Sequence, residues 1–287
     1  MKPVRVVAAL LVLAAFVPLT LPILAVEKKP EPLVVVVMDP LAAPLSCPCV
    51  AGYAQRDYDK LAKFLEKELG RPVKVHYGES LTNTLQKKSG GKADLIFGKC
   101  SVVQHEARAN NLSVAPIAAL SGKDGKTTQT GLIVVAAKDA ALAVEDLKDH
   151  RIYFGPEDCE EKHAAALALL KTHDIAVKEK PDTCIACTEG ATTVIKQHQK
   201  GEKVATVISS YAQPLLEGCG TIRKGDLRVV GETEPVPFIR AFASEKLTAT
   251  ERASLQEALL KMAKDPELCK VMETKLGFVP VETVKKN

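Results

Sequence analysis

Short, strongly apolar stretches alternate with longer amphipathic stretches along the first third of this 287-residue chain. Leu33–Met38 is a run of valine, leucine and methionine between two prolines, which is typical of a strand buried on both faces. Residues 56–70 then repeat apolar side chains at helical spacing and end at Gly70, a common helix stop. The pattern continues with strands expected at 72–77, 93–98 and 113–120 and helices at 80–91 and 101–110. This alternation predicts an α/β fold in which a mostly parallel sheet is flanked by helices.

A polar, glycine-containing stretch at residues 121–131 interrupts the pattern, which then resumes. Further strands are expected at 132–137, 151–155, 203–209, 226–231 and 238–243, and further helices at 159–174, 190–201, 210–218, 248–265 and 266–277. Two such sets indicate two α/β lobes with a ligand cleft at the carboxyl ends of their strands. We expect a discontinuous lobe 1 (33–122 and 240–287), a lobe 2 (130–236), and hinges at about 121–131 and 236–243.

The N-terminus has the pattern of a secretory signal peptide. Lys2 and Arg5 precede an apolar stretch that runs to about Leu24, and the small residue Ala25 follows. We therefore expect residues 1–25 to be removed by cleavage near Ala25, residues 26–32 to form a linker, and the mature protein to be periplasmic. The alternative is an uncleaved membrane anchor, which the short apolar core and its two prolines disfavour.

Charge and cysteine content narrow the function classes further. Removal of Lys2 and Arg5 lowers the formal net charge from +4 to +2, and basic and acidic residues are interspersed, so nucleic acid is not an expected partner. All eight cysteines lie in the exported part of the chain. An even number of cysteines in an oxidising compartment first suggests disulfides, but eight cysteines allow 105 pairings and their spacing does not select one.

The order of several motifs resembles a known family. These motifs are KLAKFLEKELGRPVKVHY, KADLIFG, TGLIVVAAKDAALAVEDLKDHRIYFGPED, ATTVIKQHQKGEKVATVISSYAQPLL and ELCKVMETKLGFVPV. Together they resemble the phosphonate/phosphate-type periplasmic solute-binding proteins of ABC transporters, which have the transferrin-like, type 2 periplasmic-binding fold. The resemblance covers roughly residues 33–281. It implies capture of a small solute between two hinged lobes, delivery to an ABC permease, a monomeric state and no catalysis.

The resemblance also implies which loops contact the solute. These loops are expected at 39–53, 98–101, about 127–130, 155–162, 187–193 and 209–211. In the family they carry hydroxyl groups and free amides at helix N-termini, which favour anions. The candidate ligand-binding residues here are Cys47, Cys49, Tyr53, Lys99, Cys100, Ser101, Thr128, Asp158, Cys159, Thr188, Ser209, Ser210 and Tyr211.

This sequence departs from the family in two ways, because thiols and acidic residues occupy these loops. Cys47, Cys49, Cys100 and Cys159 either form disulfides that pin the loops or bind a soft metal, copper or zinc, as in a metal or redox carrier that serves an exported oxidoreductase. The acidic loop around Asp158 predicts a cleft that repels phosphonates. The alternative for this loop is structural, with Asp158 and Glu161 as a capping box. No cofactor is required by the solute-binding interpretation.

Three further features leave alternatives open or exclude a class. Lys99 is expected to pair with the acidic loop across the cleft or to bind an anionic solute. Cys184 and Cys187 have the spacing of a zinc or redox pair, but a second pair is missing, so a local or partnered disulfide is favoured. Cys219 and Cys269 are expected away from the cleft, either in a disulfide or buried as thiols.

The sequence contains no nucleophile elbow and no Ser-His-Asp arrangement that this fold would assemble, so we do not expect this protein to be an enzyme.

Overall fold

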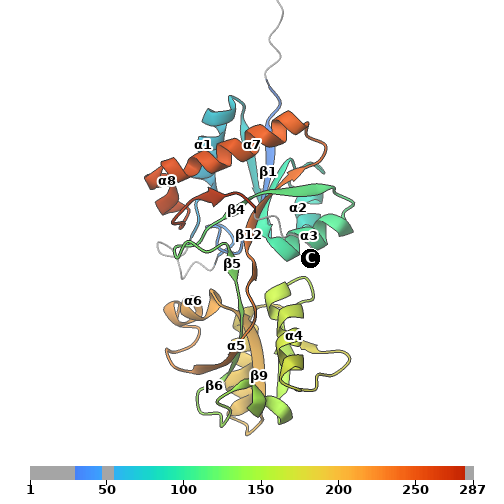
Figure 1. The fold of residues 1–287 in the computed structure, drawn as a ribbon, viewed down its shortest axis with the longest axis vertical. Helices are drawn as coiled ribbons and strands as arrows, with labels where there is room; N and C mark the ends of the chain where they lie inside the picture. The colour runs from blue at the N-terminus through green and yellow to red at the C-terminus, as the bar shows by residue number, and fades with distance from the viewer. Residues whose placement is uncertain (1–29, 47–54, 282–287) are drawn as a thin grey trace, which may run out of the picture. The chain divides into compact units, whose positions relative to one another are not determined.

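A computed structural model describes residues 30–46 and 55–281, and those from Glu31 onward belong to one compact unit, Glu31–Asn287. The expected signal peptide, Cys47, Cys49 and Tyr53 lie outside the described residues. Two main sheets form the fold (Figure 1). The first sheet has the strand order β13 (Phe278–Val279), β4 (Val114–Leu120), β12 (Ile239–Ser244), β3 (Leu95–Lys99), β1 (Leu33–Met38) and β2 (Val73–Tyr77).

The strand β1 explains why helices cover both faces of this sheet. All six of its residues are buried, as its apolar sequence predicted. Val35 and Val37 pack with α1 (Tyr58–Leu69), α7 (Ala249–Lys261) and α8 (Pro266–Val271), whereas Val36 and Met38 pack with α2 (Leu81–Lys87) and α3 (Cys100–Ala109). Because successive side chains of a strand point to opposite faces, one apolar run supports two helical layers.

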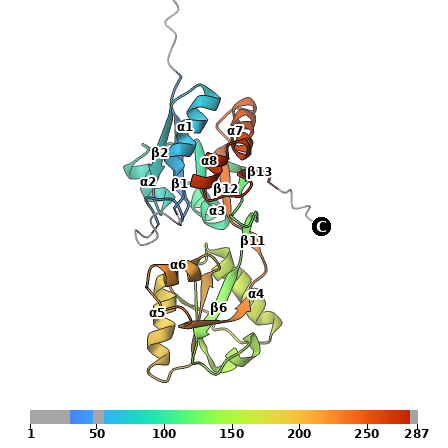
Figure 2. The same ribbon diagram turned by 90° about the vertical axis from the view of Figure 1, so that its left-hand side faces the viewer.

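The second sheet follows the same logic. Its strand order is β10 (Leu227–Glu232), β6 (Gly131–Ala136), β9 (Val204–Ser209), β7 (Arg151–Phe154) and β8 (Asp182–Thr183). Ile133 and Val135 of β6 pack with α4 (Ala164–Thr172), and Val134 packs with α5 (Cys187–His198) and α6 (Ala212–Gly218) on the other face (Figure 2). The expected lobes with a sheet between helices are therefore present in both parts of the chain.

Both sheets are mixed rather than wholly parallel. Strand β1 pairs in parallel with β2 and β3, and β7 pairs in parallel with β8 and β9. Strand β12 is antiparallel to both β3 and β4, because the chain returns to the first sheet from the second. Between the two sheets, the short strands β5 (Thr128–Gln129) and β11 (Val236–Pro237) form a two-stranded antiparallel pair.

Helix ends follow local sequence signals. Asp57 caps α1 through Lys60 N, and α1 ends at Gly70 with φ +62°, a conformation that glycine adopts without strain. Thr248 and Glu251 form a capping box at α7, and Asp265 caps α8, whose first residue is Pro266. The expected helix at 159–174 is instead a 3₁₀ turn at Glu160–Lys162 followed by α4, and α5 begins at Cys187 rather than residue 190.

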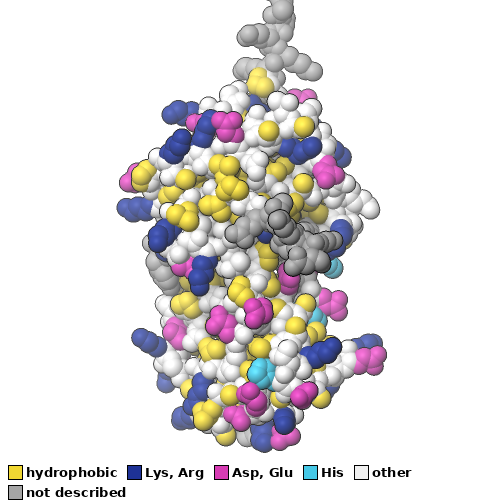
Figure 3. Space-filling view, in the orientation of Figure 1, with side chains coloured by type: hydrophobic (Ala, Val, Ile, Leu, Met, Phe, Trp, Pro, Cys, Tyr) yellow, Lys and Arg dark blue, Asp and Glu magenta, His cyan; other side chains and the backbone are white. Residues whose placement is uncertain are grey.

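The surface agrees with the balanced charge of the sequence. Lysine, arginine, aspartate and glutamate side chains are interspersed over the face shown in Figure 3. Among the described helices, none is long and apolar enough to cross a membrane.

Leu259 of α7 is fully buried in the core beside the first sheet, so the stability of the protein should depend strongly on this side chain. We expect Leu259→Ala to lower the free energy of unfolding by about 2–5 kcal/mol, because the substitution leaves a cavity. The control Leu142→Ala, at a side chain that is 71% exposed, should change it by less than about 0.5 kcal/mol. Urea titrations measure both, and equal losses would contradict the burial described here.

Candidate functional site

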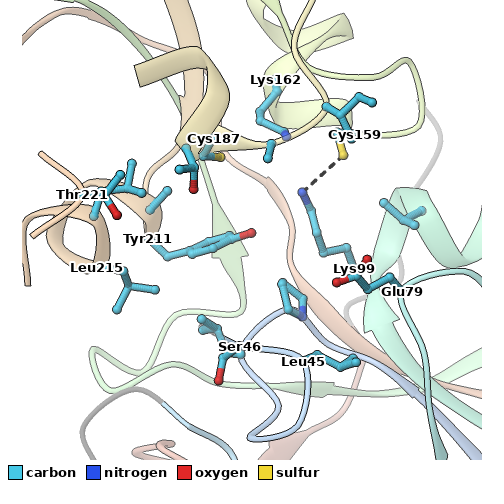
Figure 4. A pocket seen from close by; sticks show the side chains of 18 of the residues that line it. Leu45, Ser46, Glu79, Lys99, Cys159, Lys162, Cys187, Tyr211, Leu215 and Thr221 are labelled. Carbon is cyan, nitrogen blue, oxygen red and sulfur yellow. Dashed lines mark hydrogen bonds between the residues drawn. The ribbon is translucent and has the colours of Figure 1, made fainter. Parts of the chain in front are cut away.

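A cavity of about 500 Å³ lies at the carboxyl ends of strands from both sheets (Figure 4). From the first lobe it is lined by Met38, Pro40, Leu41, Leu45, Ser46, Glu79, Lys99 and Val102. From the second lobe it is lined by Cys159, Lys162, Ile185, Ala186, Cys187, Thr188, Tyr211, Ala212, Leu215, Leu216, Cys219 and Thr221. The cavity lies where the fold predicts a ligand, outside the strand ends.

A buried ion pair joins the two lobes beside this cavity. Lys99 ends β3, and its ammonium group contacts Oε1 of Glu161, which lies in the 3₁₀ turn of the second lobe. Lys99 is 7% exposed and Glu161 is fully buried. The hydroxyl of Ser209, at the end of β9, donates to the same Oε1 atom at 2.6 Å. The acidic-loop partner expected for Lys99 is therefore Glu161.

The pKa values of the two partners shift in the directions that a buried ion pair requires. Burial would lower the pKa of Lys99, but the nearby Tyr211 and Glu161 outweigh burial and raise it. Burial would raise the pKa of Glu161, but the charge and hydrogen bond of Lys99 and the hydrogen bond of Ser209 lower it. Both groups therefore remain ionised at neutral pH, and the pair is electrically neutral as a whole.

A second contact between the lobes uses backbone groups of the acidic loop. The hydroxyl of Ser101, in the first turn of α3, donates to the carbonyl oxygen of Asp158 at 2.6 Å. The same hydroxyl accepts a hydrogen bond from the amide of Glu160 at 3.2 Å. The expected capping box of Asp158 and Glu161 is not formed, because the Glu161 carboxylate contacts Lys99 and Ser209 instead.

A buried polar network supports the cavity wall from behind. Asp39, which follows β1, accepts hydrogen bonds from Arg56 and Tyr58, each at 2.7 Å. Arg56 lies over the ring of Phe238 at 5.6 Å, and Phe238 stacks on Tyr211 with ring centroids 5.3 Å apart. Burial, followed by the charge of Asp39, raises the pKa of the Tyr58 hydroxyl. This network fixes the start of the first loop and the position of Tyr211.

The cysteines do not form the predicted metal or disulfide sites within the part of the chain described. The described cysteines are free thiols, namely Cys100, Cys159, Cys184, Cys187, Cys219 and Cys269. The disulfides favoured for them, including a Cys184–Cys187 bond, are thus absent. Cys159, Cys187 and Cys219 line the cavity, so the expectation that Cys219 lies away from the cleft is wrong, because α6 brings its C-terminal end to the cavity wall. Cys100 is buried at the start of α3, and Cys269 is buried in the core of the first lobe, away from the cavity as expected.

Burial disfavours the thiolate form of three of these cysteines. Burial raises the pKa of Cys100 and of Cys159, and burial together with Glu189 raises the pKa of Cys184 to about 11. Because the thiolate is the form that binds metals, a raised pKa weakens metal binding. Residues 30–46 and 55–281 contain no group of three His, Cys, Asp or Glu side chains that could hold a metal ion. Cys47 and Cys49 lie outside those residues.

The structure brings together only part of the predicted ligand set. Lys99, Cys159, Thr188 and Tyr211 line the cavity. Ser101, Asp158 and Ser209 make the contacts described above, Ser210 accepts a hydrogen bond from Thr130 N at 3.2 Å, and Thr128 is exposed in β5.

The prediction of an acidic cleft is also not met, because Glu79 is the sole carboxylate among the described lining residues and the cavity has two lysines. Sequence analysis missed Lys162 and the apolar wall. Their signal is weak, because it consists of single residues in loops that become neighbours only after folding.

Two mixed sheets flanked by helices, with a cleft at their strand ends, define a two-lobed periplasmic-binding-protein fold. Residues 52–286 match the family described as ABC transporter, phosphonate, periplasmic substrate-binding protein, and the chain belongs to this family. Periplasmic localisation and transport with ABC permease components are properties of the family. A comparison with curated proteins finds no match.

Solved structures agree with this fold assignment. XAC2383 from Xanthomonas citri, bound to ATP, is similar at 15% identity with a TM-score of 0.62, covering 87% of this chain and 91% of its own. A binding protein component of an ABC phosphonate transporter from Pseudomonas aeruginosa has 12% identity and a TM-score of 0.62, covering 88% and 82%. PhnD1 from Prochlorococcus marinus, in complex with methylphosphonate, has 15% identity and a TM-score of 0.61, covering 88% and 93%.

The buried ion pair generates a prediction about stability. Glu161→Gln leaves the Lys99 ammonium buried without a counter-charge, so we expect a loss of about 3–5 kcal/mol in the free energy of unfolding. Adding Lys99→Met to Glu161→Gln should restore part of this loss, because it removes the uncompensated charge. A control at the exposed Lys203–Asp149 pair, Asp149→Asn, should cause little measurable loss. Lys99→Met alone completes the comparison. If the double variant loses as much free energy of unfolding in urea titrations as the two single variants together, the two residues are not a coupled pair.

The lowered pKa of Glu161 predicts acid sensitivity. A carboxyl group with a lower pKa in the folded state stabilises the protein above its ordinary value of 4.5, and this stabilisation is lost as the pH falls through the folded-state pKa. Urea titrations from pH 6 to pH 3 should therefore show a smaller loss of stability in Glu161→Gln than in the natural protein. Identical pH slopes would show that Glu161 does not titrate in this way.

Proposed function

We propose that this protein is an exported solute-binding protein that captures a small solute between its two lobes and delivers it to an ABC permease. The N-terminal signal peptide, with cleavage near Ala25, belongs to this proposal. Family membership and the fold support the class of function. The observation that carries the proposal is the cavity at the strand ends, because both lobes contribute side chains to its wall.

The connection between the sheets supports hinge bending in this proposal. The chain crosses from one sheet to the other at β5 and at β11, and these strands pair with each other. They lie within or next to the proposed hinges, 121–131 and 236–243, which separate lobe 1 (33–122 and 240–287) from lobe 2 (130–236). Opening would have to break the contacts of Lys99 with Glu161 and of Ser101 with Asp158, since these join the two lobes.

The proposal includes altered specificity relative to phosphonate binders. Lys99 and Ser209 both contact the Glu161 carboxylate, so polar groups at two strand ends already have an anionic partner within the chain. The hydroxyl of Ser101 is likewise engaged with the backbone of the acidic loop. A small phosphonate would have to displace these contacts. We propose neither catalysis nor a metal or redox role.

A blocking substitution tests the proposed site. Ala186 is exposed and lines the cavity, so Ala186→Trp should fill part of the cavity and leave the core unchanged. Ala168→Trp, at an exposed position of α4 outside the cavity lining, is the matched control. Thermal unfolding is measured with a panel of organic acids, phosphonates, amino acids and sugars.

A bound solute at a hundredfold excess over its Kd should raise the Tm by about 5–10 °C. We expect this increase in the natural protein and in Ala168→Trp and its loss in Ala186→Trp. An equal increase in all three proteins would place the binding site outside the cavity. No increase with any solute in the panel would contradict a solute-binding role.

A further inference from the structure

Lys162 is a buried cation that faces the cavity, and the Glu161 carboxylate that attracts it is hydrogen-bonded to Lys99 and Ser209 instead. Its side chain is 5% exposed and lines the cavity, and Figure 4 shows the amino group directed toward the space near Cys159 and Cys187. The amino group makes no hydrogen bond or ion pair with any described residue, although the Lys162 backbone is hydrogen-bonded to the backbones of Gly155 and Cys159. A buried ammonium group without a partner is costly, so this geometry favours an anion in the cavity.

The stem of Lys162 is held in place by a close approach to Gly155. A Cβ atom at Gly155 would lie 2.5 Å from Cβ and 2.7 Å from Cε of Lys162. The absence of a side chain at position 155 therefore gives the lysine stem its space. The hydrogen bond from Gly155 N to Lys162 O, at 3.1 Å, fixes the same turn. Lys162 is thus positioned by the fold rather than free to extend into solvent.

The two cavity lysines differ in what they can offer a ligand. The charge of Lys99 is balanced by Glu161, with which it forms a buried pair. The single carboxylate among the described lining residues, Glu79, is exposed. Among the described residues, Lys162 is therefore the buried lining cation that makes no direct ion pair. Glu161 attracts it as well, but one carboxylate against two lysines leaves the buried site with one net positive charge.

The rest of the cavity wall is mostly apolar. Its aliphatic side chains come from both lobes, namely Met38, Leu41, Leu45, Val102, Ile185, Leu215 and Leu216. Ile185 is 83% exposed and contributes to the cavity wall. A cavity of about 500 Å³ is within the range that encloses an organic ligand, and a small oxyanion would leave most of this wall uncovered.

We propose that the cavity binds an organic monoanion with an apolar chain, its anionic head on Lys162 and its chain against the aliphatic wall. This inference rests on the proposed solute-binding function and specifies its substrate class. A carboxylate or a singly charged alkylphosphonate has the required chemistry. One charge suffices because, among the described residues, two buried lining lysines, Lys99 and Lys162, share the single carboxylate of Glu161, which leaves one positive charge in excess.

Titration calorimetry on the mature protein separates charge from chain length. The probes are octanoate, its neutral analogue octanamide, its cationic analogue octylammonium, the shorter butanoate and hexanoate, and the pair octylphosphonate and methylphosphonate. We expect octanoate to bind at least about tenfold more tightly than octanamide, because only octanoate pairs with Lys162. Affinity should rise by about fourfold for each added methylene group, and octylammonium should not bind.

Lys162→Met retains most of the stem that packs over Gly155 and removes the charge. We expect it to weaken octanoate binding about tenfold or more, with little change for octanamide. It should also raise resistance to urea in the absence of ligand, since a buried unpaired charge is removed. The matched control is Lys171→Met, at an exposed position of α4, which should leave all affinities unchanged. If Lys162→Met does not fold, comparing octanoate with octanamide on the natural protein still tests whether binding requires a negative charge on the ligand.

Several outcomes would overturn the inference. These are equal binding of octanoate and octanamide, tighter binding of octylammonium than of octanoate, and tighter binding of methylphosphonate than of octylphosphonate. Binding of none of these probes would also overturn it. If another solute binds and Ala186→Trp blocks it, the proposed function stands and only the substrate class is wrong, so the two failures are distinguishable.

Discussion

The buried ion pair between Lys99 and Glu161 is the interaction on which the arrangement of the cleft depends. It joins the end of β3 in the first lobe to the 3₁₀ turn after β7 in the second. Two charges removed from water are stabilising only when their geometry is good and additional hydrogen bonds satisfy them. Ser209 supplies one of these bonds, and the Lys99 ammonium also lies 3.6 Å from the Cys159 sulfur. The second carboxylate oxygen of Glu161 has no hydrogen-bond partner, so the pair is not fully satisfied.

This pair changes what the strand ends can do. In a two-lobed binding protein, polar groups at these ends are the natural partners of a polar solute. Here Glu161 forms an ion pair with Lys99 and accepts a hydrogen bond from Ser209, and the backbone of the acidic loop accepts a hydrogen bond from Ser101. The chain therefore provides its own anion at the position where the fold would otherwise recruit one. The space left for a solute lies beside this pair, against aliphatic side chains.

The sequence predicted the elements whose signals are local and left out those that depend on distant partners. The bounds of strand β1 were predicted correctly, because a run of six apolar residues flanked by prolines is too short for a buried helix and fits a buried strand. The two-residue strands β5, β8, β11 and β13 carry no periodicity, and pairing alone defines them. The capping-box interpretation of Asp158 and Glu161 failed for a related reason. A pattern of spacing cannot show that a lysine 62 positions earlier competes for the same carboxylate.

The distribution of charge around the cavity explains why a single lysine can set specificity. Asp39 and Arg56 neutralise each other behind the wall, and Arg56 and Phe238 hold Tyr211 against it. Lys99 and Glu161 neutralise each other at its side. Each pair weakens the field of its members in the cavity, since a paired charge acts on a ligand as a dipole rather than as a full charge. The residual field of the buried described groups is then dominated by Lys162, and the low dielectric of an apolar wall strengthens its attraction for an anion. The same aliphatic wall therefore makes one unpaired ammonium group a strong discriminator of ligand charge.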